Sequence, residues 1–598
     1  MTNDSPAAAT PDRPARRDRP WDRRVALGAL APATPWDRRV ALGALALSLL
    51  LTSACSQQAP PPPPTSAETT SPAPAPYVPQ PVYCADPSVS TLCATLPSTI
   101  GPDPGLNSGF GYAGLSNFVN SAAEDVQTPF DNMSWQMFVA LNWQANQSGS
   151  DARTGLSGAG TTVWQTWARP EDVFGGPVGE CPNPNNLPRF NVIAKSGAQG
   201  SRDEEFIQAT GQPLIDVKGN WTLFERRLNS VEKDYLESKG LNTYAGQQTF
   251  IQAGNSVLFP PGDTSKTNGA PGAMELKAAW RIISPADEAR YFHTTGLIDV
   301  QGAYVRDGKP LCAEVTLGLV GLHIIQANAE QHNLLPQFIW ASFEHQDNAP
   351  FAAAACDATD AKCYKTIPNS LCPAPNAGDF SFSRTACDSV TTNSPPVLTK
   401  GDTAFIWERQ QPYAQAYLTT TASGDQCGTQ VARCWNVYHL TQQLNTAWRA
   451  QLKAIDSVFA NYYLIGTNWG GNVEPDGTQP TNGSVPTFMV NSTLETFIQS
   501  SLEFSNCVDC HKGANLAYTE TDNSTKPPTV KHFSANFSFL PGLAQQQSCA
   551  DVTAGPIYSN QQAQKVCPQI CSAKSESWNG QWTTTQFGVM SVCGCCSG

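Results

Sequence analysis

The stretch AEVTLGLVGLHII, residues 313–325, decides the fold class of this chain. It is a long run of β-branched and aliphatic residues, and QFIWASF (337–343) follows it with aromatic ones. Residues of these kinds are enriched in strands because they pack well on a pleated surface. Both stretches therefore predict β-strands.

Helical patterns lie on both sides of these strands. Apolar residues recur at helical spacing late in the chain and predict one amphipathic helix near 438–459: Leu440, Leu444, Trp448, Ile455 and Phe459. Earlier, SPADE (284–288) combines an N-cap serine, a first-turn proline and acidic residues, which is typical of a helix start. Helices mixed with strands predict an α+β fold with one large mixed domain.

Composition excludes several classes of protein. The chain has 598 residues, of which 40% are apolar and 15% charged. That length allows several cores, and the apolar fraction argues against both a polytopic membrane protein and general disorder. The net charge is −13, which disfavours binding to phosphate backbones. No nucleic-acid partner is expected.

The N-terminal segment has the features of an export signal. VALGALALSLLL (40–51) has the length of a signal-peptide core, it follows paired arginines, and Thr-Ser-Ala precedes Cys55. This resembles the bacterial lipoprotein signal, which implies cleavage after 1–54 and a lipid anchor on Cys55. Ser56 then favours the outer membrane of the cell envelope. The alternative is an ordinary secretory signal with Cys55 incidental. The proline-rich stretch that follows predicts an extended linker, 55–82.

The strongest chemical signal is CVDCH, residues 507–511. Cys-x-x-Cys-His is the attachment motif of c-type haem, because two thiols on one helical turn reach both vinyl groups of a porphyrin and the next histidine binds the iron. The motif predicts one covalent haem c on Cys507 and Cys510, with His511 as the iron ligand. The alternatives are a disulfide turn or half of a zinc site, and no second Cys-x-x-Cys stands at zinc-site spacing.

The sixth ligand of the iron stays open. Met590 is the only methionine after the motif, and it belongs to a different module described below. His323 shares the alternating face of Val315, Leu317 and Leu319, which favours a buried core histidine over a ligand. The other candidates are Met489, His345, His439 and His532. A five-coordinate, open iron is also possible and would favour enzyme chemistry.

Two further patterns surround the motif. A capping-box sequence at 492–495 predicts a short helix leading into the haem turn, so the segment near 490–545 is expected to be a helical, cytochrome c-like unit. After the motif, three phenylalanines are candidates to wall the haem: Phe533, Phe537 and Phe539.

The body carries a resemblance over roughly 130–545. SWQMFVALNW (134–143), QFIWASFEHQDNAP (337–350) and NYYLIGTNW (461–469), together with NCVDCH, resemble large bacterial single-haem cytochrome c family proteins. The resemblance implies one cytochrome c family domain, 83–545, without naming a substrate.

One acidic cluster in the body has two interpretations. Glu344, His345 and Asp347 form either a polar site or a solvated strand end. The solvated strand end is the preferred interpretation.

The C-terminus has a more specific resemblance. AGPIYSNQQAQ, WNGQWTTT and MSV, within 551–595, resemble the mannan-binding lectin family of small α+β modules. A module over 546–598 is therefore expected. The resemblance implies a site for oligomannose, in which an aromatic face stacks on sugar C–H bonds while amides and hydroxyls bind sugar hydroxyls. Its residues here would be Tyr558, Ser559, Asn560, Gln581, Trp582, Thr583 and Thr584.

The cysteines can be divided by these assignments. The chain has 19, and removing Cys55, Cys507 and Cys510 leaves an even sixteen. Six lie in the C-terminal module and ten in the body, as disulfides in an oxidising compartment require. Neighbours in sequence are plausible pairs, such as Cys356 with Cys363 and Cys427 with Cys434.

Together these features predict a lipid-anchored envelope protein. The favoured function is electron transfer to or from a redox partner protein in the envelope, with the chain held near a mannose-containing glycan or polysaccharide by its C-terminal module. The alternatives are a haem-dependent oxidase or peroxidase with an open iron position, and a carbohydrate-binding protein with a structural haem. No catalytic residue is assigned.

Overall fold

The computed structural model describes residues 127–597, apart from short gaps and the longer segments 193–204, 262–271, 328–337, 352–377, 471–483 and 500–505. The predicted signal, Cys55, the linker and the start of the body lie outside the described residues, as do Cys356 and Cys363. Within the described part, no helix combines the length and the apolar character needed to cross a membrane.

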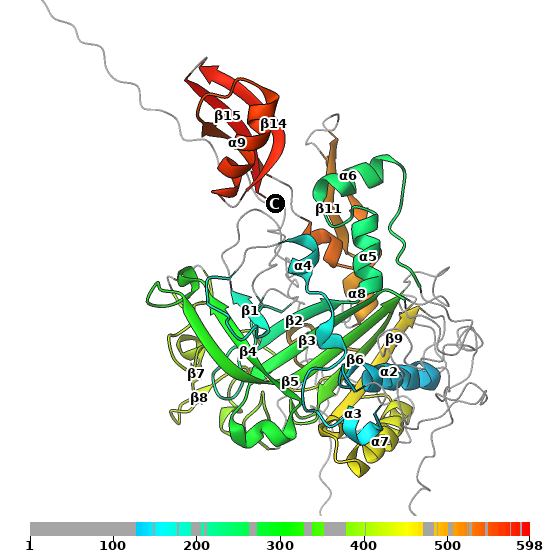
Figure 1. Ribbon diagram of the computed structural model, residues 1–598. Coiled ribbons are helices and arrows are strands. Elements are labelled where there is room, and N and C mark those ends of the chain that lie inside the picture. The colour runs from blue at the N-terminus through cyan, green and yellow to red at the C-terminus, as the bar shows by residue number, and fades with distance from the viewer. Residues whose placement is uncertain are drawn as a thin grey trace, which may run out of the picture. The chain divides into compact units, whose positions relative to one another are not determined.

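A long strand, β5 (Leu311–Ala327), organises the body (Figure 1). One edge of β5 pairs with β4 in its first half and with β6 in its second half, and the other edge pairs with β3. The two predicted strands are therefore confirmed as β5 and β6. The other strands of this sheet are β1 (Arg189–Val192), β2 (Leu223–Leu228), β3 (Met274–Ile282), β4 (His293–Val300), β6 (Phe338–His345), β9 (Tyr462–Gly470) and β10 (Ser484–Val485).

A β-bulge in β5 changes which face its side chains point to. The pairing with β3 skips Val320, which lies between Leu319 and Gly321. An extra residue in a strand reverses the alternation beyond it. Leu317 and Leu319 therefore belong to the main hydrophobic core, whereas His323 lies on the opposite face. The predicted shared face of His323 and the preceding leucines is wrong for this reason.

Two helices cover the first face of the sheet: α2 (Gln127–Leu141) and α7 (His439–Ala454). The indole rings of Trp135 and Trp448 stack between them with centroids 5.9 Å apart. The helix predicted near 438–459 is confirmed but ends earlier. Asp456 has a φ of +56°, and the amide of Ser457 donates to the carbonyl of Leu452, which closes the helix.

The second face carries shorter elements: α5 (Ser230–Ser238), α6 (Tyr244–Gln252), α8 (Cys507–His511), and the hairpin of β11 (Asn515–Asp522) and β12 (Thr529–Ser534) (Figure 1). The helical unit expected near 490–545 is therefore wrong in its described part. Only α8 is α-helical there, and short 3₁₀ turns lie at Thr496–Ile498 and Leu540–Leu543. LAYTETD and TVKHFS contain β-branched and aromatic residues (Tyr518, Thr519, Thr521, Thr529, Val530 and Phe533), which favour strands.

The remaining helices and strands of the body are short. The α-helices are α3 (Ala152–Gly155) and α4 (Pro170–Phe174), and the strands are β7 (Thr419–Thr420) and β8 (Gln426–Cys427). The helix start predicted at 284–288 is a 3₁₀ helix, Pro285–Arg290, in which the Ser284 hydroxyl donates to Asp287 (2.8 Å).

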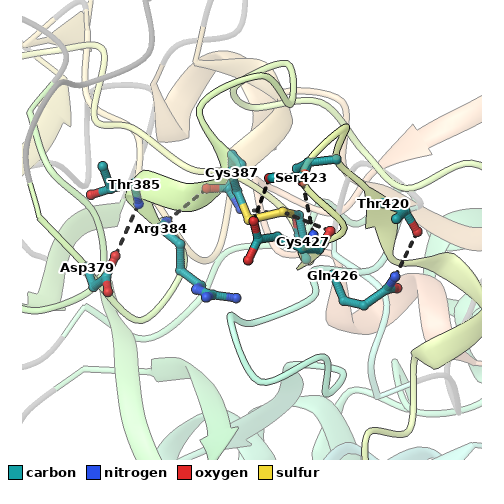
Figure 2. The surroundings of a disulfide bond; sticks show 12 residues. Asp379, Arg384, Thr385, Cys387, Thr420, Ser423, Gln426 and Cys427 are labelled. Carbon is teal, nitrogen blue, oxygen red and sulfur yellow. Dashed lines mark hydrogen bonds between the residues drawn. A yellow bond between two sulfur atoms is a disulfide. The ribbon is translucent and has the colours of Figure 1, made fainter.

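Disulfides join distant parts of the body. Cys181 bonds to Cys312, and Cys387 bonds to Cys427 beside the β7–β8 hairpin (Figure 2). The predicted pairing of Cys427 with Cys434 is wrong, although Cys434 is also disulfide-bonded. Cys427 of the hairpin bonds to Cys387, in the 3₁₀ turn at Thr385–Cys387, and not to Cys434, which is nearer in sequence.

The C-terminal module is a three-stranded sheet with one helix. Its strands are β13 (Ser548–Ala554), β14 (Ser577–Gln586) and β15 (Met590–Ser597), in the order β13-β15-β14, and its helix is α9 (Asn560–Ser572). Two disulfides connect α9 to β15: Cys567–Cys593 and Cys571–Cys595. Cysteines four apart on a helix and two apart on a strand each share one face, so the bonds form in parallel. The predicted disulfide-rich α+β module is confirmed.

Candidate functional site

The Cys-x-x-Cys-His motif forms α8, a single helical turn. The side chain of Asn506 caps it by accepting a hydrogen bond from the amide of Asp509 (2.8 Å). The amide of Val508 donates to Asn468 Oδ1 on β9 (3.1 Å). An N-terminal amide of α8, which has no acceptor within the helix, thereby hydrogen-bonds to a side chain of the sheet. This bond fixes α8 over the second face.

Cys507 and Cys510 are free thiols. The other cysteines whose bonding the structure describes are all in disulfides: Cys181, Cys312, Cys387, Cys427, Cys434, Cys567, Cys571, Cys593 and Cys595. Burial raises the pKa of both thiols, and the nearby Glu495 carboxylate raises them further. Both are therefore protonated at neutral pH, and the disulfide-turn alternative is not what the structure contains.

His511 is held in one tautomer. Its Nδ1 lies 2.7 Å from the carbonyl oxygen of Phe537. A carbonyl only accepts, so Nδ1 carries the proton and Nε2 keeps its lone pair. Burial lowers the pKa of His511 to about 4, with the hydrogen bond to Phe537 opposing the shift. The ring is neutral at pH 7 and its Nε2 is suited to bind a metal.

The carbonyl of Phe537 is aimed by an unusual turn. Asn536 and Phe537 have φ values of +51° and +68°, in the left-handed region. Asparagine tolerates this conformation, whereas for a bulky residue such as phenylalanine it costs on the order of 1 kcal/mol or more. Sequence reasoning missed this carbonyl. A backbone acceptor leaves no side-chain signal, and Asn536 alone is too common a turn residue to indicate it.

Aromatic side chains lie around the imidazole of His511. Its ring centroid is 5.7 Å from that of Trp340 on β6 and 5.0 Å from that of Phe539. Phe537 contacts Trp340 with centroids 6.2 Å apart. The predicted walls Phe537 and Phe539 are thus brought to the site, whereas Phe533 stacks on Tyr518 (5.7 Å).

Trp340 is a site residue that sequence reasoning did not single out. Its side chain is 1% exposed, and its Nε1 has no hydrogen-bond partner among the residues that the structure describes. A buried unpaired N–H costs free energy unless something else accepts it. The indole therefore offers a donor beside His511.

Among the candidate sixth ligands, His323 acts on the pKa of His511. Charge on His323 and on Lys277 lowers the pKa of His511 further. Lys277 is the direct partner of His323 across β3 and β5. His323 Nε2 lies 3.3 Å from Glu495 Oε2. These three side chains and the two thiols share the second face of the sheet.

His345 is committed elsewhere. Its Nε2 donates to the carbonyl of Arg290 (2.8 Å), its Nδ1 accepts from the amide of Asp347 (3.1 Å), and its ring stacks on Tyr291 (4.0 Å). Burial lowers its pKa to about 4. Both nitrogens are used, so His345 has none left for a metal.

The preferred interpretation of Glu344, His345 and Asp347 as a solvated strand end is wrong. Glu344 and His345 have no exposed surface. The Glu344 carboxylate pairs with Arg433 and accepts a hydrogen bond from the hydroxyl of Ser492 (2.7 Å). A buried charge needs such partners, and the surrounding loops that supply them are remote in sequence.

The other candidate ligands lie on separate elements. Met489 packs beside Gly466 of β9, where an added Cβ would come within 3.1 Å of its sulfur. His439 begins α7, on the first face, and His532 is exposed on β12. Met590 begins β15 of the C-terminal module, as expected.

In the C-terminal module the loop before α9 is well defined. Ser559 caps α9 by accepting from the amide of Gln562, and Gln562 in turn accepts from the amide of Tyr558 (3.0 Å). The Tyr558 side chain is 60% exposed. This part of the predicted sugar site presents an aromatic ring at the surface.

The second part of the predicted sugar site lies on β14. Trp582 is half-buried and packs, with Trp578, against the core formed by α9 and β15. It therefore lies between the core and the surface of the module. The backbones of Asn560, Gln581, Thr583 and Thr584 belong to α9 and β14, but their side chains lie outside what the structure describes.

Comparison with known proteins bears on this module. Residues 560–595 match the family described as mannan-binding protein. A lectin from Microcystis viridis, Lectin MVL, is 52% identical over 42 residues, which cover 7% of this chain and 37% of that protein. The chain thus spans about a third of the length of this curated relative. No solved structure matches the chain.

The C-terminal segment carries a mannan-binding lectin-like module. The family match includes Asn560, Gln581, Trp582, Thr583 and Thr584, and it begins just after Tyr558 and Ser559. In the lectin-like module the matched stretch corresponds to α9, β14 and most of β15.

Proposed function

We propose that the body of this chain is a c-type cytochrome that binds one haem through Cys507, Cys510 and His511 and transfers electrons. The observation that carries the proposal is the state of the motif: two free thiols on one helical turn, followed by a neutral histidine with its Nε2 available. A zinc site would need further ligands, and among the described residues no group of three His, Cys, Asp or Glu side chains converges as a metal site.

The residues fit the haem group. The thiols would attach the porphyrin, His511 would bind the iron, and the haem would supply one-electron redox chemistry. The Phe537 carbonyl keeps the proton on Nδ1 and orients the ring. The buried N–H of Trp340 would be available as a donor to the bound group, and Phe539 would add an apolar side chain beside His511.

Electron transfer is favoured over enzyme chemistry by His323. His323 is buried and acts on the pKa of His511, so it is a candidate to complete a six-coordinate iron, whereas an oxidase or peroxidase needs an open position. The oxidase or peroxidase remains the alternative, and a structural haem is the third possibility.

Haem staining after denaturing electrophoresis tests the attachment. The full chain, produced in a host that matures c-type cytochromes, is expected to keep haem under denaturing conditions. Cys507→Ala with Cys510→Ala should lose it, while the matched control Lys512→Ala, on an exposed neighbour, should retain it. A colourless wild-type chain would refute the proposal.

Absorption spectra separate the two redox functions. Electron transfer predicts a low-spin, six-coordinate spectrum that is unchanged by CO or cyanide. A spectrum that shifts on adding either ligand would favour the oxidase or peroxidase.

We propose that the lectin-like module binds mannose-containing glycans. The proposal is supported by the family match over 560–595 and by the exposed Tyr558. Tyr558→Ala in the full chain should weaken retention on immobilised mannan by about tenfold, since an aromatic–sugar contact of about 1 kcal/mol or more is removed. Lys565→Ala, on the exposed side of α9, serves as the control. Equal retention of both variants would exclude Tyr558 from the site.

We also propose that the chain is a lipid-anchored envelope protein. The support is the sequence around Cys55, which lies outside the described residues. Metabolic labelling with a radioactive fatty acid is expected to mark the wild-type chain and not Cys55→Ser. Labelling of neither chain would leave an ordinary secretory signal as the correct interpretation.

A further inference from the structure

Two buried glutamates lie together on the second face of the sheet. Glu232 is in the first turn of α5 and has no exposed surface, and Glu275 is on β3 and is 8% exposed. The haem function proposed above uses neither of them. Two carboxyl groups in one buried place need a physical explanation.

Asn229 brings the two glutamates together. Its side chain caps α5 by accepting from the amide of Glu232 (3.0 Å) and also accepts from the amide of Met274 (3.1 Å). Its own amide donates to the carbonyl of Met274 (3.0 Å). In a capping box the glutamate would accept that amide. Because Met274 has taken it, the carboxyl group of Glu232 is left to face Glu275, the next residue of β3.

The two carboxyl groups form a proton-sharing arrangement. Each lies close enough to affect the pKa of the other, and the Ser538 side chain also acts on Glu275. Both oxygens of Glu232 and Oε1 of Glu275 are buried and accept no hydrogen bond from the described residues. Burial raises the pKa of both groups, that of Glu232 well above its usual value. The pair therefore keeps a proton at neutral pH.

Few charges face this pair. Arg226 of β2 acts on Glu275 and favours its ionised form. Lys277 follows two residues later on the same face of β3. On α5, Lys233 and Glu237 pair with each other at the surface (2.7 Å). Among these charged groups, Arg226 is the cation that acts on the pair.

The pair is connected to the candidate haem site by two routes. Ser538 directly follows Phe537, whose carbonyl holds His511. Glu275 also lies in the same row of the sheet as Trp340, with Ile325 between them, so their backbones are about 10 Å apart. Charges at that separation in a protein interior influence each other.

We propose that Glu232 and Glu275 form a proton-binding pair whose proton occupancy is linked to the charge at the site of Cys507, Cys510 and His511. This inference rests on the proposed haem function. When an external one-electron donor adds one negative charge at the site, the pair takes up one proton from solvent and becomes neutral, with two protons in place of one. Removal of the electron by an external acceptor releases that proton.

Redox titration of the full chain at several pH values tests this link. Uptake of one proton per electron lowers the midpoint potential by up to about 59 mV per pH unit, the one-electron equivalent of a tenfold change in proton concentration. The wild-type chain should show a pH-dependent potential. Glu232→Gln and Glu275→Gln, each isosteric with the protonated acid, should flatten it. Glu237→Gln, an exposed change on the same helix, should leave it as in the wild type.

Infrared difference spectra give a second readout. Reduced-minus-oxidised spectra should contain a protonated-carboxyl band that both glutamine variants lose and that Glu237→Gln keeps. A wild-type potential that is independent of pH, or an unchanged slope in both glutamine variants, would overturn the proton-binding pair while leaving the haem function intact. Failure of the haem stain would instead refute both proposals.

Discussion

Asp131 illustrates how burial sets the charge of single residues. It lies on α2 with no exposed surface, and its carboxylate accepts hydrogen bonds from Gln127 Nε2 (2.8 Å) and Thr441 Oγ1. Burial raises its pKa to about 6, even though these hydrogen bonds lower it. In the unfolded chain the same carboxyl has its ordinary pKa of 3.8. The folded state therefore binds the proton more tightly.

This shift predicts a pH dependence of stability for Asp131→Asn. Because the folded pKa is raised, the contribution of Asp131 is fully present below pH 4 and is lost as the pH rises through 6. The wild type should lose about 2–3 kcal/mol relative to the variant between pH 4 and 7. Denaturant unfolding, followed by tryptophan fluorescence at several pH values, measures the difference.

The control for this prediction is Asp456→Asn. The Asp456 side chain is 87% exposed and pairs with Arg153 at the surface. Its variant should follow the wild-type pH profile within experimental error. Parallel profiles for Asp131→Asn and the wild type would show that the buried carboxyl is not protonated in the folded chain.

The two body disulfides whose partners the structure describes close loops of very different length. Cys181 and Cys312 are 131 residues apart, and Cys387 and Cys427 are 40 apart. The first bond links the segment before β1 to the start of β5, and the second links a 3₁₀ turn to β8. A cross-link restricts the unfolded chain more when the loop is longer.

Loop length predicts the order of their contributions to stability. Replacing Cys181 and Cys312 by alanine should cost about 5 kcal/mol, and replacing Cys387 and Cys427 about 4 kcal/mol. Thermal unfolding of the two double variants under oxidising conditions compares them directly. A larger loss of Tm from the shorter loop would contradict the loop-entropy argument.

Local patterns account for the elements that were predicted from the sequence. The apolar runs of β5 and β6 and the periodicity of α7 are properties of consecutive residues. The motif at 507–511 is likewise local. The bulge at Val320, the β11–β12 hairpin and the burial of Glu344 depend on neighbours that are remote in sequence. The sequence therefore indicated the thiols and His511, but not the carbonyl, indole and carboxyl groups around them.

At the scale of the whole molecule, one polypeptide joins a candidate redox site to a lectin-like module. The sequences of these parts point to different chemistry, and each has its own disulfides. With both proposed functions in one chain, binding of the module to a glycan surface would raise the local concentration of the redox site there, although the redox site itself makes no contact with the glycan.

This arrangement predicts that haem and mannan binding are physically coupled. Full chain applied to immobilised mannan should carry its haem absorbance with it and elute with free mannose-containing sugar. Reduction of Cys567–Cys593 and Cys571–Cys595 should release the haem protein, because α9 loses its bonds to β15. If the haem absorbance stays in the unbound fraction while haem-free chain is retained on the mannan, the coupling is contradicted.

The bulge at Val320 also divides β5 into two frames. Before Val320, odd-numbered residues face the core shared with α2 and α7; beyond it, even-numbered residues do. A single-residue deletion between Leu311 and Leu319 would therefore do more than shorten the strand. Every side chain of β5 before the deletion would move to the opposite face of the sheet. A sequence that lacks the bulge must therefore be aligned to β5 with a gap at Val320. Without that gap, its core positions would be matched to positions on the face that carries the thiols.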